Sequence, residues 1–402
     1  MAHHYLIGWE LGGGLGHAGR VKPLAAGLHA RGHHVTLALR DLVQTRRLLA
    51  DLPCPRLQAP VWLHRAVGVP EQQVSLPEIL MGCGYIDADA VDALVQGWLA
   101  LIALSGAQAL VVDYAPSALI AARIAGLPAA SVGMGFWMPP HQQPMPAYRD
   151  WEPIAPGRLA RAEQLVFDNV NRVLTRHGAA PLAQLSHLFG GDMPLLCSWP
   201  EIDHYDRGNT SGDDWLGPNY LPQSGRPPQW PAGQGPHVFA YLKSTHPDHV
   251  AVLQALVSLG CQVECYLPEV AGGKPPPVVS PQVHYADGPV DLGQACARAD
   301  LLVCHAGQAT MVQALLAGVP VLLLPMQAEQ FLMARQVERA GLGLSAALRR
   351  RPTDFKALIQ GLLAADAPQR HGARAFAERR RGFTHDTQVQ DLLARLERLP
   401  RA

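Results

Sequence analysis

The chain has 402 residues, more than the about 100 to 200 residues of an ordinary domain, and this length favours two domains. Its 33 basic residues balance its 33 acidic residues, which excludes a nucleic-acid-binding protein that relies on a basic face. Hydrophobic residues make up 48% of the chain and charged residues 16%, against about 25% charged residues in typical globular chains. This composition indicates sizeable cores and excludes a largely disordered chain.

The sequence offers no clear targeting segment. The first thirty residues lack the basic start, apolar run and small-residue cleavage site of a secretory signal. The longest apolar stretch, 93–112, is as long as a membrane span, but polar residues and glycines interrupt it, so a helix followed by a buried strand is expected there. Seven cysteines without a CxxC motif indicate buried free thiols. We therefore expect a cytoplasmic protein without an integral membrane segment, of unknown oligomeric state.

Short apolar runs alternate with helical patterns in the N-terminal half. The patterns predict strands over 5–9 and 34–39 around a helix over 20–30, and then strands over 109–113 and 128–132 around a helix over 116–125. Each group is a β-loop-α-β unit, and such units build a doubly wound parallel sheet.

A stretch rich in Gly, Pro, Ser and Asn between residues 209 and 236 predicts an interdomain linker, placed at 216–236. After it the alternation restarts, with strands over 237–242, 261–266, 301–304 and 319–324 and helices over 248–259 and 308–317. The predicted fold class is α/β, with two Rossmann-like doubly wound parallel-sheet domains facing across a cleft. The predicted domains are 1–215 and 237–384, followed by a helix over 385–402 that packs back on the first domain.

The first candidate site follows the first strand, in the sequence Gly12-Gly-Gly-Leu-Gly-His17. Glycines such as Gly14 and Gly16 let backbone amides approach a bound group, and a helix N-terminus attracts anions. His17 could act as a base near neutral pH, and Asp113, at the end of another strand, could orient its imidazole. Structural alternatives stay open: the glycines could form only a tight turn, His17 could be structural or incidental, and Asp113 could be the N-cap of the following helix. The stretch from Gly14 also fits GxGxxG, with Asp41 near the place of a ribose-binding acid, which would indicate a dinucleotide site.

The second candidate site lies in the C-terminal half, where Cys304-His-Ala-Gly-Gln-Ala-Thr310 separates a strand from a helix. The small residues keep the turn tight, while the His305 imidazole and the Thr310 hydroxyl could bind a phosphate. After the next strand, Glu329 and Gln330 supply acceptors and a donor suited to the vicinal hydroxyls of a sugar.

The stretch His305-Ala-Gly-Gln-Ala-Thr-Met-Val-Gln-Ala-Leu-Leu-Ala-Gly-Val-Pro320, continued to Pro325 and Glu329-Gln330, resembles the donor signature of the UDP-glycosyltransferase family, which includes bacterial macrolide and flavonoid glycosyltransferases. That signature reads HGGxGTxxEALxxGVPxxxxPxxxDQ. Gly16-His17, Arg31-Gly-His-His-Val-Thr36 and Trp215-Leu-Gly-Pro218 resemble the family's opening and linker entry. The resemblance covers both domains, more loosely over 55–105 and 136–210. It implies a GT-B fold and inverting sugar transfer from a UDP- or dTDP-linked nucleotide sugar to a small-molecule acceptor, without a metal or other cofactor.

The resemblance also implies roles for particular residues. His17 would be the general base and Asp113 its orienting carboxylate, while Glu329 and Gln330 would hold the sugar. The remaining residues expected at the donor are Gly14, Gly16, Lys243, Ser244, Gly288, Pro289, Val290, His305, Gly307, Ala309, Thr310 and Gln313.

Four departures from the signature affect the donor site. Ala306 and Ala309 replace glycines, a mild change if their backbone angles are ordinary. Gln313 replaces the Glu that binds the ribose diol in the family, so the sequence does not decide whether the nucleoside of the donor is uridine or deoxythymidine. Lys243 stands where the family often has Gly, either beside the phosphates or facing solvent.

Apolar and aromatic residues are expected at the acceptor, namely Phe136, Trp137, Met138 and Tyr148, unless they simply pack beneath a long loop. No DxD pair occupies a plausible metal loop: Asp213-Asp214 lies in the linker stretch between residues 209 and 236, and His246-Pro-Asp-His249 has only weak ligand spacing. The alternatives to a glycosyltransferase are a non-catalytic GT-B protein that binds sugar nucleotides, an NAD(P)-linked oxidoreductase and a GT-B epimerase.

Overall fold

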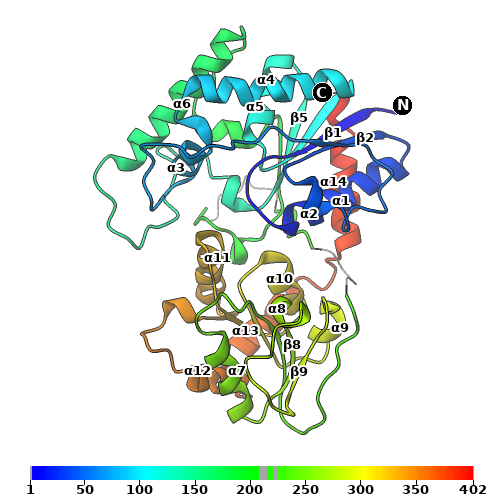
Figure 1. Cartoon of the computed structure of the whole chain (residues 1–402), viewed down its shortest axis with the longest axis vertical. Coiled ribbons are helices and arrows are strands. Elements are labelled where there is room, and N and C mark those ends of the chain that lie inside the picture. The colour runs from blue at the N-terminus through cyan, green and yellow to red at the C-terminus, as the bar shows by residue number, and fades with distance from the viewer. Residues whose placement is uncertain (1, 208–214, 221–224, 402) are drawn as a thin grey trace. The chain divides into compact units, whose positions relative to one another are not determined.

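The structure is a computed structural model that describes residues 2–207, 215–220 and 225–401. The chain divides into two compact units (Figure 1). Unit 1 comprises residues 1–199, 205–217 and 386–402, and unit 2 comprises 200–204 and 218–385. The predicted linker, 216–236, includes 221–224, which lie outside the described residues. Residues 200–204, which the sequence assigns to the first domain, group with unit 2.

The sheet of unit 1 has six parallel strands in the order β3-β2-β1-β4-β5-β6. Its strands are β1 His4–Trp9, β2 His34–Leu39, β3 Arg56–Gln58, β4 Ala109–Asp113, β5 Ala129–Gly133 and β6 Met193–Leu196. This is the doubly wound order: β2 and β3 are added on one side of β1, and β4 to β6 are added on its other side, so the strand order reverses between β1 and β4. In their register, Trp9 lies beside Asp113, so both strands end at the same edge of the sheet.

The helices of unit 1 cover a sheet that is buried on both faces, as a parallel sheet requires. They are α1 Leu15–Ala30, α2 Leu42–Thr45, α3 Leu76–Leu80, α4 Ala88–Ser105, α5 Pro116–Ala125, α6 Arg158–Arg176 and α14 His385–Leu396. Helix α14, red in Figure 1, contributes Leu392, Leu393 and Leu396 to the core beneath α1. A Cβ at Gly27 of α1 would lie 2.3 Å from Leu393, so this glycine lets the two helices approach closely.

Unit 2 repeats this architecture with the order β12-β11-β10-β7-β8-β9. Its strands are β7 His237–Tyr241, β8 Gln262–Tyr266, β9 Val283–Tyr285, β10 Leu301–Cys304, β11 Val321–Leu323 and β12 Gly343–Ser345. Its helices are α7 His249–Ser258, α8 Pro268–Ala271, α9 Leu292–Cys296, α10 Gln308–Leu316, α11 Ala328–Arg339, α12 Phe355–Leu363 and α13 Pro368–Arg379. Here the strand order reverses between β7 and β10. The predicted class, two Rossmann-like doubly wound parallel sheets, is therefore confirmed.

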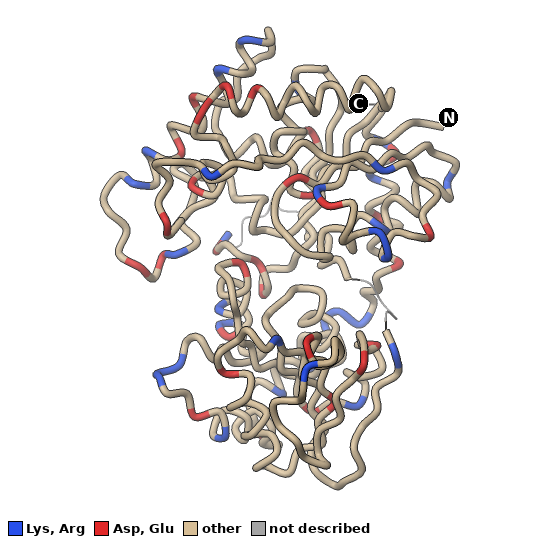
Figure 2. Tube along the Cα trace, viewed as in Figure 1, with Lys and Arg blue, Asp and Glu red and all other residues tan. Residues whose placement is uncertain are grey.

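The apolar stretch 93–112 consists of helix α4 followed by the buried strand β4, as predicted. Among the described residues, α4 is one helix that is long and apolar enough to cross a membrane by length and composition alone. It packs against α5 and α6, and its Trp98 ring lies against Gly8 of β1. Acidic and basic residues are interspersed on both units (Figure 2), consistent with the balanced composition.

Two predictions about local structure need correction. Helix α1 begins at Leu15, five residues before the predicted start, because Gly14 at its N-cap adopts a φ of 87° that ends the turn early. His17 therefore lies in the first turn of α1 and not in the preceding loop. All seven cysteines are free, but Cys83 is only partly buried, at a kink where Gly84 has positive φ.

Candidate active site

The loop between β1 and α1 brings the His17 side chain to the edge where β1 and β4 end. The Leu11 amide donates to the Tyr114 carbonyl oxygen (2.9 Å), and the Trp9 indole donates to the Leu11 carbonyl oxygen (2.7 Å). Gly12 and Gly14 then take positive φ values of 77° and 87°, a region that glycine occupies without strain. The resulting turn starts α1 directly above the switch point of the sheet, the usual ligand position in this architecture.

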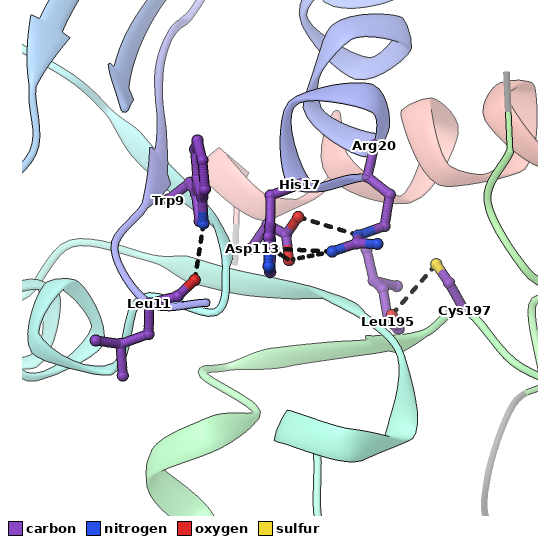
Figure 3. Close-up of polar contacts among 7 residues, drawn as sticks. All are labelled: Trp9, Leu11, His17, Arg20, Asp113, Leu195 and Cys197. Atoms are coloured by element: carbon purple, nitrogen blue, oxygen red, sulfur yellow. Dashed lines mark hydrogen bonds and ion pairs between the residues drawn. The ribbon is translucent and has the colours of Figure 1, made fainter. Parts of the chain in front are cut away.

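The structure brings His17 and Asp113 together, and both side chains are buried (Figure 3). Nδ1 of His17 lies 3.3 Å from Oδ1 of Asp113. Asp113 does not cap a helix: the N-cap of α5 is Ala115, and the carboxylate of Glu10 accepts the Ser117 amide there. A buried imidazole beside a carboxylate is an arrangement suited to a general base.

A third residue, Arg20, completes this cluster and was not predicted from the sequence. Its Nε donates to Oδ2 of Asp113 (3.0 Å), and its Nη2 lies 3.4 Å from Oδ1 and 2.9 Å from Nδ1 of His17. The spacing of three residues on α1 places Arg20 on the same helix face as His17, which is the signal that could have revealed it. The buried cluster therefore holds one fixed positive charge next to one carboxylate.

Aromatic rings enclose the imidazole of His17. The Trp9 ring stacks on one side at 5.1 Å, and Trp137 lies at 5.2 Å, itself stacked on Tyr114. The Arg20 guanidinium lies over the Trp137 ring at 4.7 Å from its centroid. A Cβ at Gly12 would lie only 2.4 Å from Nε2 of His17, so a side chain at position 12 would clash with this nitrogen and the glycine avoids the clash.

The surroundings set the charges of the pair. Burial lowers the pKa of His17; the Asp113 carboxylate opposes this effect, and the Arg20 guanidinium adds to it. Burial alone would raise the pKa of Asp113, but the charges of Arg20 and His17 outweigh it and hold that pKa below its ordinary value. At neutral pH the cluster therefore contains a neutral imidazole, which can accept a proton, and an ionised carboxylate.

In unit 2, the corresponding sheet edge brings together the loops after β7 and β10. The Lys243 amide donates to Nε2 of His305 (2.9 Å), and Nδ1 of His305 donates to the Leu324 carbonyl oxygen (2.8 Å). Burial lowers the pKa of His305, so the ring is neutral. Both ring nitrogens are thus engaged. Nε2 accepts the Lys243 amide and carries no proton, so it could donate to a phosphate only after leaving this contact and gaining a proton. The Lys243 side chain itself is exposed, whereas the Ser244 amide donates to Glu269 (3.2 Å).

Helix α10 begins three residues after His305, and no side chain of its N-cap residue, Gly307, caps its first turn. That first turn, which contains Ala309 and Thr310, has no acidic residue. Amides at such a helix start lack intrahelical acceptors and attract anions. The side-chain amide of Gln313 donates to the Ala309 carbonyl oxygen (3.0 Å).

The backbone at Ala306 differs from the expectation. Its φ is 59°, in the left-handed region, and its side chain is buried. The replacement of glycine at this position is therefore not the mild change that ordinary backbone angles would make it, because an L-residue costs about 1 to 2 kcal/mol in this conformation.

The other predicted donor residues of unit 2 lie at the same edge of its sheet, whereas two glycines lie in unit 1. Glu329 and Gln330 are half-buried in the first turn of α11, after β11, and Oε1 of Gln330 accepts the Met326 amide (2.9 Å). The loop 288–290 follows β9, and its Pro289 carbonyl oxygen accepts the Arg226 amide (2.8 Å). In unit 1, Gly14 and Gly16 are exposed in the loop and first turn before His17.

The four predicted acceptor residues are buried. Trp137 forms part of the enclosure around His17, while Phe136 and Tyr148 pack on each other with ring centroids 5.7 Å apart. Met138 lines a cavity of about 460 Å³ in unit 1, together with His141, Phe189 and Leu196. The structure shows that these residues pack within unit 1, and their acceptor role stays a prediction.

The remaining candidates have structural partners. The Asp41 carboxylate caps α2 by accepting the Val43 and Gln44 amides. Nδ1 of His246 accepts the Asp248 amide, and Nδ1 of His249 faces the His246 carbonyl oxygen. Within the described ranges, no group of three potential metal-ligating side chains comes together. Asp213 and Asp214 lie outside the described residues.

Comparisons with known proteins bear on both units. Residues 271–385 match the sequence model of the glycosyltransferase family 28 C-terminal domain. A PGL/p-HBAD biosynthesis rhamnosyltransferase of Mycobacterium bovis is 31% identical over 252 residues, which cover 58% of this chain and 54% of the relative. The chain thus spans about half the length of that relative. A PGL/p-HBAD biosynthesis glycosyltransferase of Mycobacterium tuberculosis is 27% identical over 353 residues, 83% of this chain and 78% of the relative.

Solved structures resemble the whole chain. The calicheamicin glycosyltransferase CalG4 superposes with a TM-score of 0.69 at 17% identity, covering 98% of each chain. The spinosyn rhamnosyltransferase SpnG complexed with thymidine diphosphate gives 0.66 at 18% identity, covering 97% of this chain and 99% of that chain. These likenesses show the GT-B fold, and together with the family match they confirm the resemblance to glycosyltransferases predicted from the sequence.

Proposed function

We propose that the protein is an inverting, metal-independent glycosyltransferase that moves a sugar from a nucleoside diphosphate to a hydroxyl of a small, apolar acceptor in the cytoplasm. The observation that carries this proposal is the buried His17–Asp113 pair at the switch point of unit 1, where a neutral imidazole is held beside an ionised carboxylate. The family match over 271–385 supports the sugar-nucleotide part of the proposal.

In this mechanism, Nε2 of His17 takes the proton of the acceptor hydroxyl as its oxygen forms a bond to the anomeric carbon. The bond from that carbon to the diphosphate breaks on the opposite face, so the configuration inverts and the nucleoside diphosphate leaves with the electron pair. Asp113 stabilises the imidazolium that forms. The positive end of the α10 helix dipole, where no acidic residue lies in the first turn, would stabilise the charge of the leaving diphosphate, a task that requires no metal in this proposal.

We propose a deoxythymidine donor in preference to a uridine donor. Gln313 stands in place of the Glu that grips a ribose diol in the family signature, and its amide is tied to Ala309. A carboxylate that accepts from two ribose hydroxyls is less needed when the 2′-hydroxyl is absent. One structural neighbour is a rhamnosyltransferase complexed with thymidine diphosphate, which agrees with this choice.

The acceptor is proposed to contact the apolar and aromatic residues of unit 1. The cavity beside Met138 has mostly apolar walls, and its volume of about 460 Å³ suits one small molecule. A flat or greasy small molecule fits such walls better than a polysaccharide does.

The test of the proposal is a product assay in which a panel of nucleotide sugars and aglycones is incubated with enzyme and analysed by mass spectrometry. His17→Ala should lower turnover by at least about 10²-fold and leave nucleotide-sugar affinity nearly intact, because it removes the base and no donor contact. Asp113→Asn should cause a smaller loss of turnover.

His29→Ala is the matched control, since His29 is exposed on the same helix, and it should keep full turnover. EDTA should change neither rate nor affinity. If the wild-type chain binds nucleotide sugar but neither transfers nor hydrolyses it, the non-catalytic alternative holds. Full activity of His17→Ala with an alcohol acceptor would exclude His17 as the base.

A further inference from the structure

Arg20 is the one member of the buried cluster to which the proposed mechanism gives no task. It lies 8% exposed, and its guanidinium contacts both the carboxylate of Asp113 and Nδ1 of His17. The inference below rests on the proposed role of His17 as a base and adds a function for Arg20.

The atoms around Nδ1 of His17 allow only one hydrogen bond at a time. Arg20 has no acceptor, so its Nη2 can only donate to Nδ1, and this requires that Nδ1 carries no proton. The Asp113 carboxylate is ionised and can only accept, which requires a proton on Nδ1. The contact with Arg20 is the shorter of the two, 2.9 Å against 3.3 Å.

This geometry selects a tautomer. When Nδ1 accepts from Arg20, the proton of the neutral ring is on Nε2, and a protonated Nε2 cannot take a proton from the acceptor hydroxyl. The base becomes active only when the proton lies on Nδ1 and is donated to Asp113. The change needs little movement, because Nη2 of Arg20 already lies 3.4 Å from Oδ1 of Asp113 and can donate there instead.

We propose that Arg20 is a positioning residue that holds His17 in the inactive Nε2–H tautomer at rest and releases Nδ1 to Asp113 when His17 acts as the base. Its two contacts with Asp113 keep the guanidinium in place through both states. The stacked Trp137 ring supports the guanidinium from one face.

The charged and titratable groups that face His17 come from several elements. Arg20 comes from α1, Asp113 and Tyr114 from the end of β4, and Arg40 from the end of β2, while Cys197 after β6 lies near Arg20 and Asp113. Without the Arg20 charge, burial and the Arg40 charge still lower the pKa of His17, while the Asp113 carboxylate raises it. The imidazolium of His17 is then better stabilised, and its pKa should rise.

The experiment is ¹⁵N NMR of the full-length chain, with the His17 signals assigned by comparison with His17→Asn. In the wild-type chain the neutral His17 ring should show the Nε2–H tautomer. In Arg20→Gln it should show the Nδ1–H tautomer, and its pKa should rise by about one unit, within the range that a nearby charge produces. The acid limb of the kcat/KM profile should move to higher pH by the same amount.

Arg31→Gln is the control, because Arg31 lies at the C-cap of α1 and pairs with Glu397, away from the cluster. It should leave the tautomer, the pKa and the pH profile unchanged. Arg20→Lys keeps the charge and one donor, and it should keep the His17 pKa close to that of the wild type.

An Nδ1–H tautomer in the neutral wild-type chain overturns the proposal, and this measurement needs no variant to fold. An unchanged tautomer and pKa in Arg20→Gln overturns it as well. The NMR readouts do not depend on turnover. If they come out as expected but no sugar is transferred, the proposed function fails while the effect of Arg20 on His17 stands.

Discussion

Replacing Gly12 by Ala should impair catalysis by moving the base, although the substitution adds only one methyl group. The new Cβ would lie 2.4 Å from Nε2 and 2.9 Å from Cε1 of His17. The nitrogen would have to move by about 1 Å to reach an ordinary contact, and a displacement of this size in a reacting group can cost about 10²-fold in rate. The Trp9 and Trp137 rings, whose centroids lie 5.1 Å and 5.2 Å from that of the imidazole, limit how the ring can adjust.

The two neighbouring glycines separate this contact from backbone strain. Gly12 and Gly14 both have positive φ, but a Cβ at Gly14 meets no atom within 4 Å. Gly14→Ala should therefore lose about 1 kcal/mol of stability through strain alone, without displacing the His17 ring. Gly13 has neither positive φ nor a close neighbour, so Gly13→Ala should resemble the wild type.

The assay measures kcat, the affinity for free nucleoside diphosphate and the free energy of unfolding for all three variants. Gly12→Ala should lower kcat by about 10²-fold relative to Gly13→Ala and leave nucleoside diphosphate binding unchanged, because His305 and Thr310, the proposed diphosphate contacts, lie in unit 2. Gly14→Ala reports on backbone strain through the free energy of unfolding only, since Gly14 is itself among the residues expected at the donor. If Gly12→Ala kept a kcat within a few-fold of that of Gly13→Ala, the inference that Gly12 leaves space for Nε2 of His17 would be refuted.

Three further predictions concern other residues. Ala306→Gly should raise the free energy of unfolding by about 1 kcal/mol in denaturant titration, since it relieves a left-handed alanine; a loss of stability would show that the buried methyl matters more than the backbone. Burial raises the pKa of Glu10 to about 7, against hydrogen bonds from Ser117, so between pH 4.5 and 7 the folded state holds a proton that the unfolded state has released. This carboxyl therefore makes the free energy of unfolding fall as the pH rises through that window, by up to about 1.4 kcal/mol per pH unit. Glu10→Gln should make the free energy of unfolding depend less on pH. If denaturant titrations at several pH values gave the same pH dependence for both proteins, the raised pKa of Glu10 would be contradicted. In calorimetric titrations, His305→Ala should weaken binding of both free nucleoside diphosphate and nucleotide sugar by about tenfold or more, whereas Glu329→Gln should weaken only the sugar nucleotide; equal losses in Glu329→Gln would place the sugar elsewhere.

The sequence by itself determined the order and type of the regular elements. Strand β4 and helix α5 begin and end at the predicted residues, because apolar periodicity, Pro116 and Gly126 are local signals. The alternation of strands and helices then implied parallel sheets, and the strand ends implied the edge where His17 and Asp113 meet. The stretch 305–330 identified the resemblance to glycosyltransferases for the same reason: its residues are contiguous along the chain.

Only the tertiary structure decided what surrounds those residues. Arg20 reaches Asp113 across 93 positions of sequence, and no local pattern records such a contact. The left-handed φ of Ala306 and the approach of Gly12 to His17 depend on how turns are held by neighbouring strands. Trp137 was predicted at the acceptor as an aromatic residue, but its stacking on Tyr114 and its contact with Arg20 come from the packing of separate loops at one sheet edge. Local signals specify elements, whereas the charges and contacts that tune a site come from residues that are distant in the chain and close only after folding.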